Sequence, residues 1–228
     1  MKLFLSHLLL ASLTVSSFAQ QMPKETVDTK AKAILDELSK KTKAYTSIKA
    51  EFGIVVTGAD KKEKENSSGA LSLKGTKYKL DVKGQSIYCD GKNQWTYIPE
   101  SKEVQINCAP DPNKTESISP VNIFTLYEKG FKSVYFSEET VGTAKCDVID
   151  LYPLDPKGKK YHRVTLYIDK TKKQIVQVKI FSKTDQSVTT ITVKSFTANS
   201  EMPDTTFTFD IKKFPGTEEV DLREDDCK

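Results

Sequence analysis

The sequence predicts a mainly β protein with some helix: a large curved antiparallel sheet of about ten to eleven strands, covered by two or three short helices. About ten short segments have strand composition, and turns rather than helices separate most of them. Helical spacing of apolar residues occurs in only two places. Strands that outnumber helices so strongly favour one antiparallel sheet with a few helices packed against it.

Residues 1–19 have the pattern of a secretory signal peptide. Lys2 supplies the positive start, an apolar run follows over residues 3–13, and Ser17 and Ala19 are the small residues before the cleavage point. The apolar run is shorter than the roughly 20 residues of a membrane-spanning helix. We therefore expect a soluble, exported protein with a single domain over residues 20–228.

The charge balance argues against nucleic acid as a partner. The chain has 35 Lys and Arg residues against 31 Asp and Glu residues. Its lysines are interspersed with acidic residues, whereas nucleic-acid binding needs a clustered basic surface. The pattern is typical of a solvated surface.

Four cysteines can form disulfides in an exported chain. If residues 85–108 form a three-stranded meander, Cys89 and Cys108 lie on strands about 9–10 Å apart, beyond the Cα reach of a disulfide, which is about 7 Å. Cys146 is the better partner for either. Cys227 lies in an acidic tail that we expect to be mobile.

A helix is predicted over residues 29–43, or as far as residue 46. Asp28 or Thr29 can cap its start. A second, shorter helix is predicted after a loop that begins at Ala109, with Ser119 and Pro120 as its cap and first residue. This mid-chain helix ends at Gly130 and must lie across a face or the mouth of the sheet.

Strands are predicted where apolar and polar residues alternate, or where strand-forming residues lie between turns. Residues 88–106, YCDGKNQWTYIPESKEVQI, form a meander with turns at Asp90-Gly91 and at residues 99–102. The other predicted strands are 48–56, 69–74, 77–83, 86–90, 146–152, 163–168, 175–182, 188–196 and 206–209.

The sequence contains no catalytic motif, and we expect no enzyme activity. GxSxG, Ser-x-x-Lys and HExxH are absent. The adjacent Glu138 and Glu139 point to opposite faces of an extended chain. His162 is the only histidine after the signal, and no CxxC occurs, so we expect neither a metal site nor a cofactor.

The candidate site is an apolar cavity on the concave face of the sheet. A sheet of this size curls or closes, and a few short helices fill too little of its concave face. Such places hold apolar ligands. For any single residue core packing is the better explanation, and only the whole arrangement favours a ligand. The candidate lining residues are Phe52, Ile54, Val56, Leu71, Leu73, Leu80, Trp95, Tyr97, Phe124 and Tyr127.

Four segments carry a resemblance to a known family. They are GALSLKGTKYKL (69–80), the meander of residues 88–106, SPVNIF (119–124) and the C-terminal FTFD with FPGTEEVDL (207–222). In this order they resemble the motifs of the LolA family, the periplasmic lipoprotein carriers of Gram-negative bacteria. The meander, with its DG, W, Y and P, is the most specific of the four.

The resemblance implies a half-barrel closed by helices, whose apolar interior holds the acyl chains of lipoproteins. It implies a periplasmic location, an inner-membrane transporter as donor and an outer-membrane acceptor. We expect a monomer that contacts membranes only transiently. The family arginine that helps to hold the lid closed is replaced here by Gly75. Lys74 is therefore the candidate lid latch, although lysine lacks the planar fork of arginine.

Two other functions are left open. The first is a periplasmic lipid-binding sensor or regulatory module on the same half-barrel, which binds a partner protein. Relatives of that kind often carry a further domain, for which this chain has no room. The second is a hydrolase that uses His162.

Overall fold

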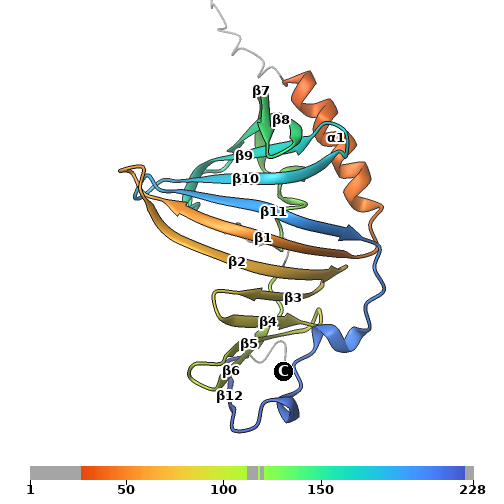
Figure 1. Ribbon diagram of the computed structural model, residues 1–228, viewed down its shortest axis with the longest axis vertical. Coiled ribbons are helices and arrows are strands. Elements are labelled where there is room, and N and C mark those ends of the chain that lie inside the picture. The colour runs from red at the N-terminus through yellow and green to blue at the C-terminus, as the bar shows by residue number, and fades with distance from the viewer. Residues whose placement is uncertain (1–26, 112–117, 119–120, 224–228) are drawn as a thin grey trace, which may run out of the picture.

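A computed structural model describes residues 27–111, 118 and 121–223 of the 228-residue chain. Within these ranges it contains one α-helix, three 3-10 helices and a single sheet of twelve strands (Figure 1). The predicted class, mainly β with a large curved antiparallel sheet, is confirmed. The predicted signal peptide, the predicted cap at residues 119–120 and Cys227 lie outside the described residues.

The elements have the following bounds in chain order. They are α1 (Thr29–Lys43), β1 (Ile48–Thr57), β2 (Glu63–Lys74), β3 (Lys77–Val82), β4 (Gln85–Cys89), β5 (Asn93–Ile98), β6 (Glu103–Cys108), η1 (Leu126–Glu128), β7 (Phe131–Val141), β8 (Ala144–Pro153), β9 (Tyr161–Asp169), β10 (Gln174–Ser182), β11 (Val188–Ala198), η2 (Asp204–Phe207), η3 (Ile211–Lys213) and β12 (Glu218–Asp221).

The strands lie in the order β12-β6-β5-β4-β3-β2-β1-β11-β10-β9-β8-β7. Neighbours are antiparallel, except that β12 runs parallel to β6. The sheet does not close, because β12 and β7 are its two edges. Two connections join strands that are not neighbours, namely β6 to β7 and β11 to β12.

Two of the twelve strands are not predicted by the sequence. In β7 a bulge between Tyr135 and Ser137 breaks the two-residue alternation by which a strand is recognised. β12 has only four residues, three of them acidic, and it forms by pairing with β6.

Two predicted elements have another conformation. Residues 206–209 are not a strand, since η2 and the residues after it occupy this stretch. The mid-chain helix is reduced to the three residues of η1. So short a helix is not stable by itself in water, and its neighbours Ile123 and Phe124 are buried against the sheet. Packing therefore determines the path of this segment.

The helix α1 is confirmed with its predicted start. Asp28 is the N-cap, and its side chain accepts a hydrogen bond from the Ala31 backbone N–H at 3.0 Å. Ala31, Leu35 and Leu38 lie on one side of the helix and are buried. The helix thus packs against the sheet with a single apolar stripe.

The strand register defines two faces of the sheet. Directly opposite residues of neighbouring strands share a face. The face that carries α1 is called the inner face, and two rows of paired apolar side chains run across it. One row is Ala50, Leu71, Leu80 and Ile87, and the other is Ile54, Ile191, Val178, Leu166 and Ile149. Together with the stripe of α1 they form one buried core.

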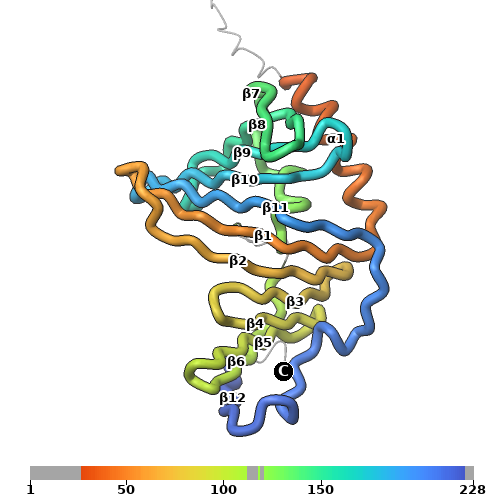
Figure 2. Tube along the Cα trace, viewed as in Figure 1, coloured from red at the N-terminus to blue at the C-terminus, as the bar shows by residue number. Residues whose placement is uncertain are grey.

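The two long connections lie on opposite faces (Figure 2). Residues 109–130 lead from β6 to β7 at the far edge, and Ile123, Phe124 and Tyr127 join the core of the inner face. Residues 199–217 lead from β11 back to the β6 edge. Phe209 of this connection packs against Tyr88 of β4, which points to the outer face.

The cysteine pairing differs from the expected one. Cys108 belongs to a disulfide, whereas Cys89 and Cys146 are buried free thiols. Cys146 lies on β8, far across the sheet from β4 and β6, so the expectation that it pairs with Cys89 or Cys108 is wrong. Cys89 and Cys108 are separated by β5, as the meander predicted. Burial raises the pKa of both free thiols and keeps them protonated at neutral pH.

We predict that the C-terminal connection contributes strongly to stability. Phe207 is fully buried, whereas Phe136 on the edge strand β7 is 63% exposed. Replacing a buried Phe by Ala lowers the free energy of unfolding by about 3–5 kcal/mol, whereas an exposed replacement changes it by less than about 0.5 kcal/mol. Urea unfolding of Phe207→Ala and Phe136→Ala should show this difference. Equal losses for the two variants would contradict it.

Candidate functional site

Eight of the ten predicted lining residues lie together. By register, the six from β1, β2 and β3 point to the inner face: Phe52, Ile54, Val56, Leu71, Leu73 and Leu80. Phe124 and Tyr127 of the mid-chain connection pack into the same core. The structure therefore brings these eight side chains to one apolar region.

Trp95 and Tyr97 lie elsewhere. Trp95 pairs with Tyr88 and Ile106 on the outer face, while its neighbour Thr96 points to the inner face. The ring of Tyr97 lies 5.4 Å from Phe209 and 4.5 Å from Phe214, measured between ring centroids. The placement corrects the prediction that these two aromatics line the same cavity. Tyr97 belongs to the surface on which the C-terminal connection packs.

A cavity of about 370 Å³ opens on the inner face at the strand ends remote from α1. Its apolar part is lined by Ile54 and Val56 of β1, Ile180 of β10 and Ile191 of β11. The other lining residues are Ile118, Tyr161, Lys83, Lys160, Ser182, Ser187 and Thr189. This cavity, called the strand-end cavity below, has apolar walls and a polar mouth.

A second cavity of about 440 Å³ lies between α1, η1 and β7. Leu35, Tyr127 and Phe131 line its apolar part, and charged residues such as Lys43 and Glu128 surround it. We call it the helix cavity. A third hollow of about 600 Å³ is lined mainly by polar and charged side chains of the outer face, such as Glu51, Asp81 and Lys194.

Two stacked aromatic rings lie between the first two cavities. Phe131 lines the helix cavity, and Tyr161 lines the strand-end cavity. Their ring centroids are 6.4 Å apart, with an angle of 18° between the planes. In this conformation the pair limits how far a chain from one cavity can extend towards the other.

The start of α1 is fixed to β7 through Asp28. Besides capping the helix, its carboxylate accepts a hydrogen bond from the Tyr135 backbone N–H at 2.8 Å. The Lys30 ammonium lies 3.4 Å from the centre of the Tyr135 ring. The hydrogen bonds from Ala31 and Tyr135 lower the pKa of Asp28 below its usual 3.8, because they favour the ionised form.

The end of α1 is fixed to the mid-chain connection through Glu128. One carboxylate oxygen accepts a hydrogen bond from the Ser39 hydroxyl at 2.7 Å, and the other lies 3.1 Å from the Lys43 ammonium. The Tyr127 hydroxyl donates to Thr42 Oγ1 at 3.4 Å. Burial raises the pKa of Tyr127 to about 12, so this hydroxyl stays protonated.

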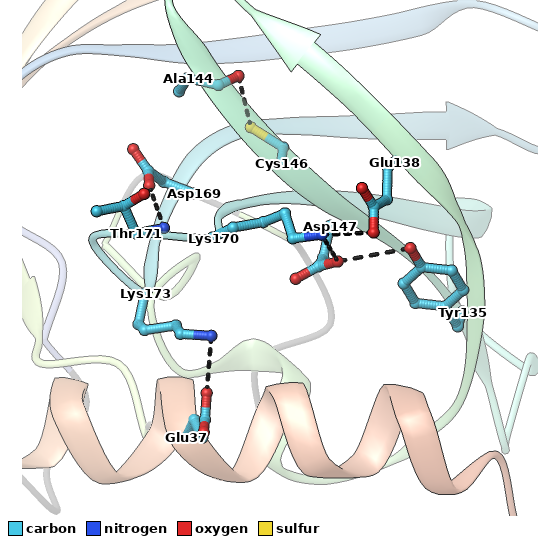
Figure 3. Close-up of polar contacts among 10 residues, drawn as sticks. All are labelled: Glu37, Tyr135, Glu138, Ala144, Cys146, Asp147, Asp169, Lys170, Thr171 and Lys173. Carbon is cyan, nitrogen blue, oxygen red and sulfur yellow. Dashed lines mark hydrogen bonds and ion pairs between the residues drawn. The ribbon is translucent and has the colours of Figure 1, made fainter.

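Ion pairs fix the sheet beside the middle of α1 (Figure 3). Lys173, in the β9–β10 turn, lies 3.0 Å from Glu37 of the helix. Lys170 in the same turn contacts Glu138 of β7 and Asp147 of β8. The Glu138 carboxylate raises the pKa of Lys170, and the ammonium lowers that of Glu138. These contacts hold three strands and the helix in register.

Lys74 fixes the C-terminal connection rather than α1. Its ammonium donates to the Met202 carbonyl and to Asp204 Oδ1, both at 3.0 Å. Lys77 reaches the other Asp204 oxygen at 2.6 Å, and the two lysines lower the pKa of Asp204. Gly75 has a φ of 60° in the β2–β3 turn, a backbone conformation that glycine adopts without strain.

The sequence gives no signal for Glu128 as the contact between α1 and the mid-chain connection. It is 89 residues from Ser39, and only the fold brings the two together.

Within the ranges described, no three His, Cys, Asp or Glu side chains are placed to hold a metal ion. None of the described helices is long and apolar enough to cross a membrane. What the region offers chemically is apolar surface beneath a helix.

Solved structures share this fold at low sequence identity. An uncharacterised conserved protein from Thermus thermophilus aligns with a TM-score of 0.54 and 13% identity, covering 86% of this chain and 99% of its own. Lipoprotein LppX from Mycobacterium tuberculosis aligns with a TM-score of 0.50 and 16% identity, covering 77% and 98%. No curated protein sequence matches this chain significantly.

The family model covers most of the sheet. Residues 43–210 match the model described as outer membrane lipoprotein carrier protein LolA. The match runs from the end of α1 to the C-terminal connection and includes every inner-face strand residue discussed above. The chain therefore belongs to the LolA family.

Proposed function

We propose that this protein is a periplasmic carrier that binds the acyl chains of lipoproteins on its inner face. It receives them from an inner-membrane transporter and delivers them to an acceptor at the outer membrane. The observation that carries the proposal is the apolar inner face with its two cavities, the helix cavity beside α1 and η1 and the strand-end cavity remote from them. Membership of the LolA family supports it.

The energetics of an acyl chain require such a shelter. Each methylene group exposed to water costs about 0.8 kcal/mol, so a lipid anchor needs an apolar surface while it crosses an aqueous compartment. No reaction is needed for this task. The carrier works as a monomer and meets membranes only while it loads or unloads.

Release requires that α1 leave the inner face at moderate cost. The pair of Lys43 and Glu128 is partly solvated, with 64% and 21% of the side chains exposed, and such pairs contribute about 0–1 kcal/mol. Burial of Leu35 and Leu38 supplies the larger part of the free energy that holds α1 on the inner face, about 1.5–3 kcal/mol per side chain. A lid of this strength closes the helix cavity and still opens on encounter with an acceptor.

Depletion in the source organism tests the proposal. Lipoproteins destined for the outer membrane should accumulate in the inner membrane, as measured by fractionation.

Two adjacent valines offer a matched pair for complementation of the depleted strain, because Val56 lines the strand-end cavity and Val55 points to the outer face. We expect that Val55→Glu restores sorting and that Val56→Glu does not. An unchanged distribution of lipoproteins on depletion would refute the carrier function.

Photo-crosslinking tests the binding face directly. A benzophenone amino acid at Val56 should crosslink to the acyl part of lipoproteins, because this position faces the cavity. The same probe at Trp95, on the outer face, should give little of this product. Mass spectrometry of the adducts identifies the cargo. Capture of one protein partner without any lipoprotein would instead support the sensor.

Acid should loosen α1 through Asp28. The pKa of Asp28 in the folded chain lies below its usual 3.8. The stabilisation that the ionised carboxylate gives to the folded chain is therefore complete above about pH 3.8, and it is lost as the pH falls through the lowered pKa. The protection factors of the α1 amides, which correct for the intrinsic pH dependence of amide exchange, should therefore fall below about pH 4. Asp28→Asn should reduce this pH dependence at the start of α1, while the contacts of Glu37 and Glu128 still titrate. The control is Asp60→Asn in the β1–β2 turn, where the pKa of the carboxyl group is also lowered. This variant should preserve the pH dependence of the α1 amides. Equal pH dependence in the wild type and Asp28→Asn would contradict the role of Asp28.

A further inference from the structure

The mouth of the strand-end cavity is cationic. Lys83, in the β3–β4 turn, and Lys160, just before β9, both line the cavity. Among the described residues that line it there is no Asp or Glu. The apolar walls are formed by the inner-face side chains of β1, β10 and β11. A ligand with an apolar chain and an anionic end therefore matches both parts of the cavity.

The two lysines differ in how they are engaged. The Lys83 ammonium lies 2.8 Å from Glu65, but both side chains are well exposed, so the pair is weak and can exchange for a ligand. Lys160 makes no ion pair with any described residue, and it is exposed. Asp185 is close to the mouth in sequence, but it accepts hydrogen bonds from the Ser187 hydroxyl and backbone N–H within its own turn.

Hydroxyl groups lie beside the lysines. Ser182, Ser187 and Thr189 line the cavity at the β10–β11 turn. Thr189 pairs with Val56 on one side and with Ile180 on the other, so it shares the inner face with the apolar walls. Hydroxyl donors next to ammonium groups suit carboxylate and phosphate oxygens.

The size of the cavity points to one chain. Its volume is about 370 Å³, near the lower end of the range of about 300–1,000 Å³ for small-molecule sites. A water molecule occupies about 30 Å³ in the liquid, and a methylene group is of similar size, so about a dozen methylene groups fit. The stacked Phe131 and Tyr161 separate this volume from the helix cavity. Three acyl chains need more room than this.

We infer that the strand-end cavity binds a single-chain anionic amphiphile, with its carboxylate or phosphate between Lys83 and Lys160 and its chain against Ile54, Ile180 and Ile191. A free fatty acid and a lysophospholipid share this chemistry. The inference rests on the proposed function in that the inner face accepts acyl chains. It adds a distinct ligand class, because the lysines at the mouth select for charge.

Calorimetric titration of the mature chain tests the inference with three ligands of equal chain length. These are dodecanoate, dodecanoyl lysophosphatidylglycerol and neutral monododecanoylglycerol, each below its micelle concentration. We expect the two anionic ligands to bind at least about tenfold more tightly than the neutral one, because only they meet the ammonium groups. Tight binding of only one of the two identifies the head group as carboxylate or phosphate.

A charge reversal with a matched control isolates the mouth. Lys160→Glu should weaken anionic binding by at least about tenfold and leave neutral binding unchanged. Lys157→Glu lies in the same loop, outside the cavity lining, and should change neither. Circular dichroism verifies the fold of each variant, and Lys83→Gln provides a second test with a smaller change of charge.

The outcomes separate this inference from the proposed function. Equal binding of anionic and neutral ligands, unaffected by Lys160→Glu, overturns the inference. The carrier function then stands if lipoproteins still crosslink at Val56. Selective binding of anionic ligands together with unchanged lipoprotein sorting on depletion supports the inference and refutes the carrier function. Absence of binding by all three ligands overturns the inference as well.

Discussion

The connection between β6 and β7 is the constraint on which the rest of the structure depends. These strands lie near opposite edges of the sheet, so the chain between them must cross its full width. It crosses on the inner face and buries Ile123, Phe124 and Tyr127 there. α1 then needs a partner besides the sheet and finds it in η1, through Glu128. Both cavities follow from this crossing, because one segment and one helix cannot fill the inner face of twelve strands.

The second crossing explains why large aromatics lie on the outer face. The C-terminal connection returns from β11 to the β6 edge and needs apolar side chains to pack against. Tyr88 and Tyr97 meet Phe209 there, and Lys74 and Lys77 hold Asp204 at the start of the same segment. The meander of β4, β5 and β6 thus has two roles. Its inner side continues the half-barrel, and its outer side anchors the end of the chain.

The sequence predicted local structure well and its assembly only in part. Alternation and turn residues located β1, the meander and α1, because these signals are local. The bulge in β7 concealed a strand, since one extra residue reverses the alternation. Alternation also placed Trp95 and Tyr97 on a common face but could not say which, because that depends on the register of neighbouring strands. The contact of Glu128 with Ser39 depends on the path of the whole chain.

Holding and releasing an acyl chain place opposite demands on α1, and magnitudes show how one helix can meet both. The helix buries two leucines and an alanine, which is worth several kcal/mol at about 1.5–3 kcal/mol per leucine. An acyl chain of about a dozen methylene groups gains roughly 10 kcal/mol on leaving water. An entering chain can therefore displace the leucines from the inner face. The polar contacts of Asp28 and Glu128 are too weak to prevent this, but they determine where the helix docks again once the chain has left.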